Sequence, residues 1–138
     1  GTFLPVRSER LEDHVMHAES VFIPPSTVLG IKKARREGRR LWVLGTTAAR
    51  AVESMAEGLL ASTSEGGFAG ATRLFIQPGY EFKHVDALLT NFHQPKSTLL
   101  SLVAAFFGPN RWKPAYEWAM AQRFKLFSYG DLSVWMRQ

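Results

Sequence analysis

Near the start of the chain, two histidines and a glutamate are grouped closely enough to exchange protons: His14, His17 and Glu19. Three such groups could hold a metal ion, but residues 15–23 have the pattern of a strand. Side chains alternate between the faces of a strand, so His14 points away from the other two. His17 and Glu19 share a face at a spacing of about 7 Å, and a carboxylate beside an imidazole orients it and raises its basicity. The pattern predicts a catalytic pair, with a purely structural pair as the alternative.

A second polar segment, Gly45-Thr46-Thr47, joins a predicted strand to a predicted helix, and Arg50 lies one turn into that helix. Free backbone N–H groups at a helix start attract anions and carboxylates. The segment contains neither the Gly-Lys-Ser/Thr signature of a P-loop nor GxGxxG. It indicates an anion- or carboxylate-binding turn, although capping of the helix by a threonine would explain the same residues.

The densest polar run, residues 90–98, stands directly before an apolar helix. Amide, imidazole, ammonium and hydroxyl groups of this kind suit the edge of a sugar or a base. The alternative is an elaborate capping loop. The candidate ligand-binding residues are Asn91, His93, Ser97 and Thr98.

Another candidate lies near the end of the chain, where Ser128-Tyr129-Gly130-Asp131 places an aromatic ring beside a carboxylate. Tyr129 could stack on a base and Asp131 could bind a ribose, while a simple turn or strand bulge is the alternative.

The elements that would position these residues alternate between strand-like and helix-like patterns. This alternation predicts an α/β fold, with a mixed, mainly parallel sheet or a partial barrel and flanking helices. Leu41–Leu44 and Leu74–Ile76 are expected to be interior strands, and Ser62–Gly70 a flexible loop. The other predicted elements are strands at Val15–Ile23 and Leu126–Met136 and helices that begin near Ser26 or Thr27, after the turn Gly45-Thr46-Thr47, after Ser97 or Thr98, and near Pro114.

Two helices carry apolar residues at helical spacing. Ala51, Met55 and Leu59 predict a buried stripe on the helix after Thr47, and Tyr116, Met120 and Phe124 predict another. Ser97 or Thr98 is expected to cap the apolar helix that runs to Phe107.

The composition narrows the class of protein. The formal charge of +5 favours a polyanionic partner, although an ordinary basic surface gives the same value. The basic cluster Arg35, Arg36, Arg39 and Arg40 also has two interpretations. It could bind phosphates, or its cations could simply suit the carboxyl end of a helix. Cysteine is absent, which excludes disulfides and thiolate zinc sites and fits a cytoplasmic protein. The sequence contains no run of about 18 apolar residues, so it predicts no membrane span.

Taken together, these motifs resemble those of the S-adenosylmethionine:tRNA ribosyltransferase-isomerases of the queuosine pathway, over essentially the whole chain. Gln94 departs from the leucine usual at that place, which bears on the shape of the pocket. The matching runs are Gly1–Arg7 with His14, His17 and Glu19; Gly45–Thr47 with Arg50; Phe75–Gly108, which includes Thr90-Asn91-Phe92-His93; and Phe127–Asp131.

The resemblance implies that S-adenosylmethionine donates its ribosyl group, as a substrate, to the aminomethyl-deazaguanine wobble base of tRNA, giving epoxyqueuosine without a metal. It implies catalytic roles for His17, Glu19 and Asp131. It implies substrate binding by Arg7, Thr46, Thr47, Arg50, Asn91, His93, Ser97, Thr98 and Tyr129.

Members of this family are longer than 138 residues. The resemblance places the chain, as a single domain, at the carboxy-terminal part of their large α/β domain, without the amino-terminal part and the inserted β-barrel domain. Such a piece is expected to be nearly inactive alone. The competing hypothesis is a non-catalytic RNA-binding module, in which basic charge and the tryptophans Trp42, Trp112, Trp118 and Trp135 would contact phosphates and stack on bases.

Overall fold

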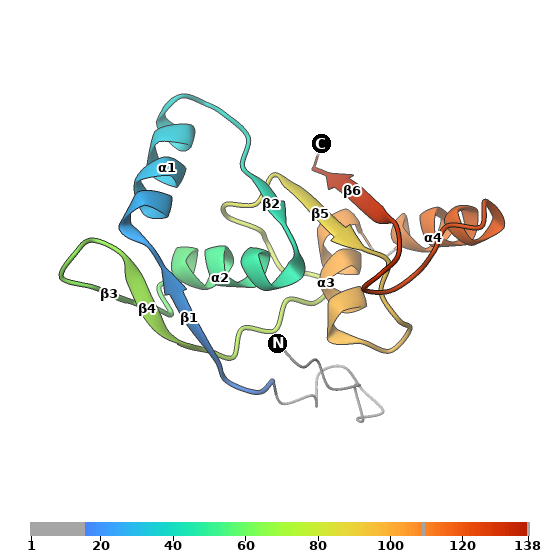
Figure 1. Cartoon of the computed structure of the whole chain (residues 1–138), viewed down its shortest axis with the longest axis horizontal. Coiled ribbons are helices and arrows are strands. Elements are labelled where there is room, and N and C mark those ends of the chain that lie inside the picture. Colours follow the sequence, from blue (N-terminus) through green and yellow to red (C-terminus); the bar gives the residue numbers. More distant parts are fainter. Residues whose placement is uncertain (1–15, 109, 138) are drawn as a thin grey trace.

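The computed structural model of the chain describes residues 16–108 and 110–137. Arg7 and His14, named above, lie outside the described residues. The predicted α/β class is confirmed. The elements, labelled in Figure 1, are β1 (Glu19–Ile23), α1 (Pro25–Arg36), β2 (Trp42–Leu44), α2 (Thr46–Ala56), β3 (Ala61–Ser62), β4 (Phe68–Thr72), β5 (Ala87–Asn91), α3 (Thr98–Phe107), α4 (Trp112–Ala121) and β6 (Leu132–Met136).

One sheet carries the main core and has the strand order β2-β5-β6. β2 runs parallel to β5, with Val43 opposite Leu88, and β6 runs antiparallel to β5, with Trp135 opposite Leu88. These three side chains are buried together with apolar residues of α3 and α4. Helices therefore cover one face of a mixed sheet (Figure 1).

A second sheet is antiparallel and has the order β1-β4-β3. The prediction of a flexible loop over Ser62–Gly70 is wrong, because β3 and β4 pair as a hairpin within it. The turn places Gly66 at φ +89°, and the Gly67 N–H donates to the Thr63 hydroxyl at 3.0 Å. A Cβ on Gly67 would lie 2.6 Å from the Ile23 carbonyl oxygen, so the glycine lets the hairpin approach β1. The glycines and serines thus form a tight turn.

Two of the predicted strands differ in the structure. Leu74–Ile76 forms no strand, although Ile76 is buried in the core. β2 is at the edge of its sheet, with Trp42 and Leu44 exposed, so the prediction of an interior strand is wrong there too. An apolar run shows that both faces of a strand are hydrophobic and does not show that both are covered.

The ends of the helices follow simple chemistry. α1 begins at Pro25, with Pro24 at the N-cap and no side-chain cap, so the predicted caps at Ser26 or Thr27 are wrong. Proline suits this first position because its missing N–H would have had no helical partner. The predicted cap of α3 is confirmed, since the Ser97 hydroxyl accepts from the Leu100 N–H at 3.1 Å.

The predicted apolar stripes are only partly buried. In α2 the residues that face the interior include Val52, Glu53 and Ser54, whereas Leu59 lies beyond the helix and is exposed. In α4 Tyr116 and Ala119 are buried and Met120 is exposed.

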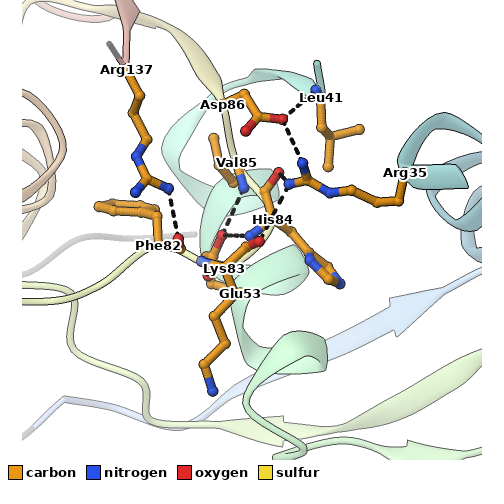
Figure 2. Close-up of polar contacts among 9 residues, drawn as sticks. All are labelled: Arg35, Leu41, Glu53, Phe82, Lys83, His84, Val85, Asp86 and Arg137. Atoms are coloured by element: carbon orange, nitrogen blue, oxygen red, sulfur yellow. Dashed lines mark hydrogen bonds and ion pairs between the residues drawn. The ribbon is translucent and has the colours of Figure 1, made fainter. Parts of the chain in front are cut away.

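Glu53 holds α2 to the segment that leads into β5. Its carboxylate is completely buried and accepts the backbone N–H groups of Lys83, His84 and Val85 at 2.8, 2.9 and 2.8 Å (Figure 2). It also accepts the Tyr80 hydroxyl at 3.0 Å. Four donors on one carboxylate compensate the cost of burying a charge.

The same segment is fixed from its other side. Arg35 of α1 forms an ion pair with Asp86 at 3.0 Å, and the Asp86 carboxylate accepts the Leu41 N–H at 2.7 Å (Figure 2). Arg137 donates to the Phe82 carbonyl at 2.6 Å. Arg35 therefore has a structural partner and is not a free cation of the basic cluster.

Candidate functional site

A pocket of about 470 Å³ lies where β2 and β5 end. Because these strands are parallel, their carboxyl ends meet at one edge of the sheet, which is where ligands bind in open α/β sheets. The Gly45 N–H donates to the Leu89 carbonyl at 2.7 Å and joins the two strand ends. The lining residues are Gly45–Thr47, Thr90–Ser97, Leu99, Phe127 and Ser128.

The turn at Gly45 sets the direction of α2. Gly45 is the N-cap at φ +88°, a conformation that favours glycine, and no side chain caps the helix. The N–H groups of Thr46 and Thr47 therefore have no partner inside the helix. With both threonines in the lining, this wall offers N–H and hydroxyl donors at the positive end of a helix dipole.

His93 is the titratable imidazole of the pocket. Its Nε2 lies 2.8 Å from the Thr90 hydroxyl oxygen, and its backbone N–H donates to the Tyr116 hydroxyl at 3.0 Å. Burial lowers the pKa of His93 to about 4 from the usual 6.5. The ring is therefore neutral at pH 7, because burial disfavours its protonated form.

The loop after His93 leads into α3. The Ser97 hydroxyl caps α3 and donates to the Gln94 carbonyl at 2.7 Å. Lys96, at φ +55°, is the one cation among the residues that line the pocket. Asn91, which also lines the pocket, donates to the Gly130 carbonyl at 3.1 Å, which ties the end of β5 to the turn before β6.

Behind Thr46 lies a small cavity of about 10 Å³, bordered by Arg50 and Thr98. Thr46 and Leu99 border both cavities. The Arg50 guanidinium is almost buried and forms an ion pair with Glu19 at 2.6 Å. Glu19 on β1 is thereby linked to the helix that forms one wall of the pocket.

The structure brings together five of the predicted site residues, Thr46, Thr47, Asn91, His93 and Ser97, in the pocket lining. Arg50 and Thr98 lie one layer behind, at the small cavity.

Four predicted residues lie elsewhere or are used differently. Tyr129 is fully exposed and is not part of the lining, although Phe127 and Ser128 are. Asp131 accepts the Lys125 N–H at 2.7 Å and so shapes the turn. His17 is exposed and precedes β1, which begins only at Glu19. His17 and Glu19 therefore do not share a regular strand face, contrary to the prediction from the sequence.

Two residues of the site were missed in the sequence. In the sequence, Thr90 is only the first residue of the polar run, and Tyr116 belongs to an apolar stripe. A hydroxyl three residues before a histidine was the available signal for Thr90. The Tyr116 contact joins residues far apart in the chain, and no local pattern marks it.

Two further properties concern metal binding and membrane spans. In residues 16–108 and 110–137, no group of three or more histidine, cysteine or acidic side chains could hold a metal ion. Within the same described part of the chain, no helix has the length and apolar character needed to cross a membrane.

Comparisons with known proteins agree with one another. The family model described as queuosine biosynthesis protein matches residues 1–134. Curated proteins named S-adenosylmethionine:tRNA ribosyltransferase-isomerase are similar: one from Geobacter sulfurreducens is 53% identical over 133 residues, covering 95% of this chain and 37% of that protein. One from Chlorobium phaeovibrioides is 47% identical, covering 95% of this chain and 38% of that protein.

A solved structure is similar as well. The crystal structure of S-adenosylmethionine tRNA ribosyltransferase from Thermotoga maritima superposes with a TM-score of 0.76 at 43% identity, covering 83% of this chain and 40% of the other. The chain thus spans less than two fifths of the length of these two curated relatives.

Proposed function

This chain belongs to the family of queuosine biosynthesis proteins, and on that premise we propose that it forms part of an enzyme that transfers and isomerises a ribosyl group. The donor is S-adenosylmethionine, a substrate, and the acceptor is the aminomethyl-deazaguanine base at the wobble position of a tRNA. The product is epoxyqueuosine, with adenine and methionine as leaving groups. The names of the relatives, at about half identity over nearly the whole chain, support this assignment.

The observation that carries the proposal is the gathering of Thr46, Thr47, Asn91 and His93 in one pocket. Its volume of about 470 Å³ is within the range for small-molecule sites. Hydroxyl and amide groups suit a ribose or a base edge, and the start of α2 suits a carboxylate such as that of a methionine moiety. We assign the pocket to part of the S-adenosylmethionine site.

We propose His93 as a proton acceptor in this pocket. The reaction requires a base to free the amine nucleophile and to remove a proton next to the sulfonium. The ring is neutral at pH 7 and so carries a lone pair that can accept a proton, although burial also lowers its basicity. Thr90 would hold the ring through its hydroxyl.

The other proposed residues come from the family motifs. We propose that His17, Glu19 and Asp131 take part in proton transfer and that Arg7, Arg50, Ser97, Thr98 and Tyr129 contribute to substrate binding. Glu19 has support from its contact with Arg50, next to Thr46. tRNA would bind through its phosphates, in keeping with the net charge of +5.

The test uses a chimera, defined as the Geobacter sulfurreducens relative in which this chain replaces the matched segment. In the chimera, His93→Gln is expected to lower tRNA-dependent release of adenine from S-adenosylmethionine by about 10²–10⁴-fold. His84→Gln is the matched control, because His84 is a half-buried histidine outside the pocket. Wild-type turnover by a folded His93→Gln chimera would refute the assignment of the pocket.

A further inference from the structure

The sheet β2-β5-β6 has an apolar face that α3 and α4 do not cover. Side chains alternate along each strand, so the residues opposite one another in the register share a face. Trp42, Ala87 and Met136 form one such row, Leu44, Leu89 and Val134 the next, and Asn91 and Leu132 the last.

The outer residues of this face are strongly exposed. Trp42, Leu44, Leu132 and Val134 are 52%, 68%, 54% and 52% exposed. Their neighbours on the same strands, Val43 and Trp135, point to the other face and are buried. The exposed side chains form one contiguous surface, whereas scattered apolar residues need no explanation. We refer to Trp42, Leu44, Leu89, Leu132, Val134 and Met136 as the open face.

The composition of the open face indicates what would cover it. None of its six side chains is charged, so it suits an apolar layer of protein and would not attract a nucleic acid backbone.

We propose that the open face packs against the part of the longer family protein that this chain does not span. The two curated relatives extend well beyond it, since it matches only 37% and 38% of their lengths. A covering layer from the remaining polypeptide would turn the half-covered sheet into the interior of a larger domain.

The open face also borders the pocket. Asn91, in the last row of this face, pairs with Leu132 and also lines the pocket. Polypeptide packed on the open face therefore reaches the edge of the pocket and contributes to its wall. This inference depends on the family and the geometry, and it holds whichever reaction the pocket performs.

The chain contains a matched set of probes. Trp42 and Met136 lie on the open face, while Trp118 and Met120 lie on α4 and are 60% and 53% exposed. Tryptophan and methionine are readily oxidised where solvent reaches them. Oxidative footprinting should be compared between the isolated chain and the chimera. Oxidation of Trp42 and Met136 is expected to fall by about fivefold or more in the chimera, while Trp118 and Met120 change little.

A second measurement uses a charge on the open face. Val134→Lys is expected to lower the Tm of the chimera by about 10 °C and that of the isolated chain by no more than about 2 °C, because the lysine is buried only in the former. Leu29→Lys is the control, since Leu29 is 65% exposed on α1.

Three results would overturn the proposal. The first is equal oxidation of Trp42 and Met136 in the two proteins. The second is a Val134→Lys change that lowers the Tm of the chimera no more than that of the isolated chain. The third is an isolated chain that light scattering shows to be a dimer and whose Trp42 is already protected, since a second copy would then be the occupant. Adenine release is not measured in this test, so a failure of the proposed function can be distinguished from a failure of this inference.

Discussion

In the pocket wall, the Thr90 hydroxyl oxygen lies 2.8 Å from Nε2 of His93, so that a strand residue holds the ring of a loop residue. If this contact positions the ring, Thr90→Val should lower kcat of the chimera by about tenfold with little change in KM. Thr90→Ser should restore the rate, because it keeps the hydroxyl. The pH profile of kcat would shift with Thr90→Val, and an unchanged profile and rate would show that the contact has no role in turnover.

The burial of His93 predicts how stability depends on pH. The pKa of His93 is about 4 in the folded chain and 6.5 when exposed, so between these values the unfolded chain binds a proton that the folded chain does not. The stabilisation is complete above pH 6.5 and is lost as the pH falls through 4. Compared with His93→Gln, the wild-type chain should lose at most about 1.4 kcal/mol more per pH unit in this window. Urea unfolding at several pH values measures the difference, and parallel curves would contradict it.

Removing the charge of Glu53 should be costly. Glu53→Gln keeps the shape of the side chain but turns an amide N–H₂ toward backbone donors, so about 3 kcal/mol of unfolding free energy should be lost. Glu57→Gln is the matched control, because Glu57 lies one turn later and is only half-buried. Denaturant unfolding of both variants measures the difference, and similar small losses would show that the Glu53 contacts are not needed.

The Glu19–Arg50 ion pair should show energetic coupling. Arg50 is the more buried partner, so Glu19→Gln, which leaves the guanidinium without its carboxylate, should cost more than Arg50→Gln. A double-mutant cycle on thermal unfolding should give a coupling energy of about 1 kcal/mol. Additive losses would mean that the contact contributes no stability.

The proposed catalytic role of His17 has its own test. His17→Ala in the chimera should lower turnover by about 10²–10⁴-fold and leave tRNA affinity largely unchanged, since that affinity rests mainly on phosphate contacts. Because His17 is exposed, its loss should not change the Tm. Turnover, tRNA affinity and thermal unfolding are measured on one sample, and a stable variant with wild-type turnover would exclude a catalytic role.

Local sequence signals were sufficient for much of the pocket. Thr46 and His93 lie in short polar segments that follow apolar strands, and parallel strands bring such segments to one edge. The same reasoning failed at Tyr129, because the direction of a side chain in a turn depends on the backbone that precedes it. Phe127, at φ +70°, starts such a turn, and no local pattern in the sequence marks it.

The parts of the fold that were missed depend on distant partners. Leu74–Ile76 is as apolar as a strand, yet no neighbouring strand pairs with it. Glu53 has the sequence character of an exposed helix residue, but the three backbone N–H groups that its buried carboxylate accepts lie 30 to 32 positions away. Propensity and periodicity describe a segment and do not describe what that segment meets.

The Glu53 contacts have a consequence for the energetics of ligand binding. They lock α2 to the segment that enters β5, while the first turn of α2 and the last residue of β5 form two walls of the pocket. Because helix and strand are stiff over such short lengths, the two walls keep their spacing when no ligand is bound. A ligand that enters between them therefore pays little ordering entropy, and more of its contact energy is expressed as affinity.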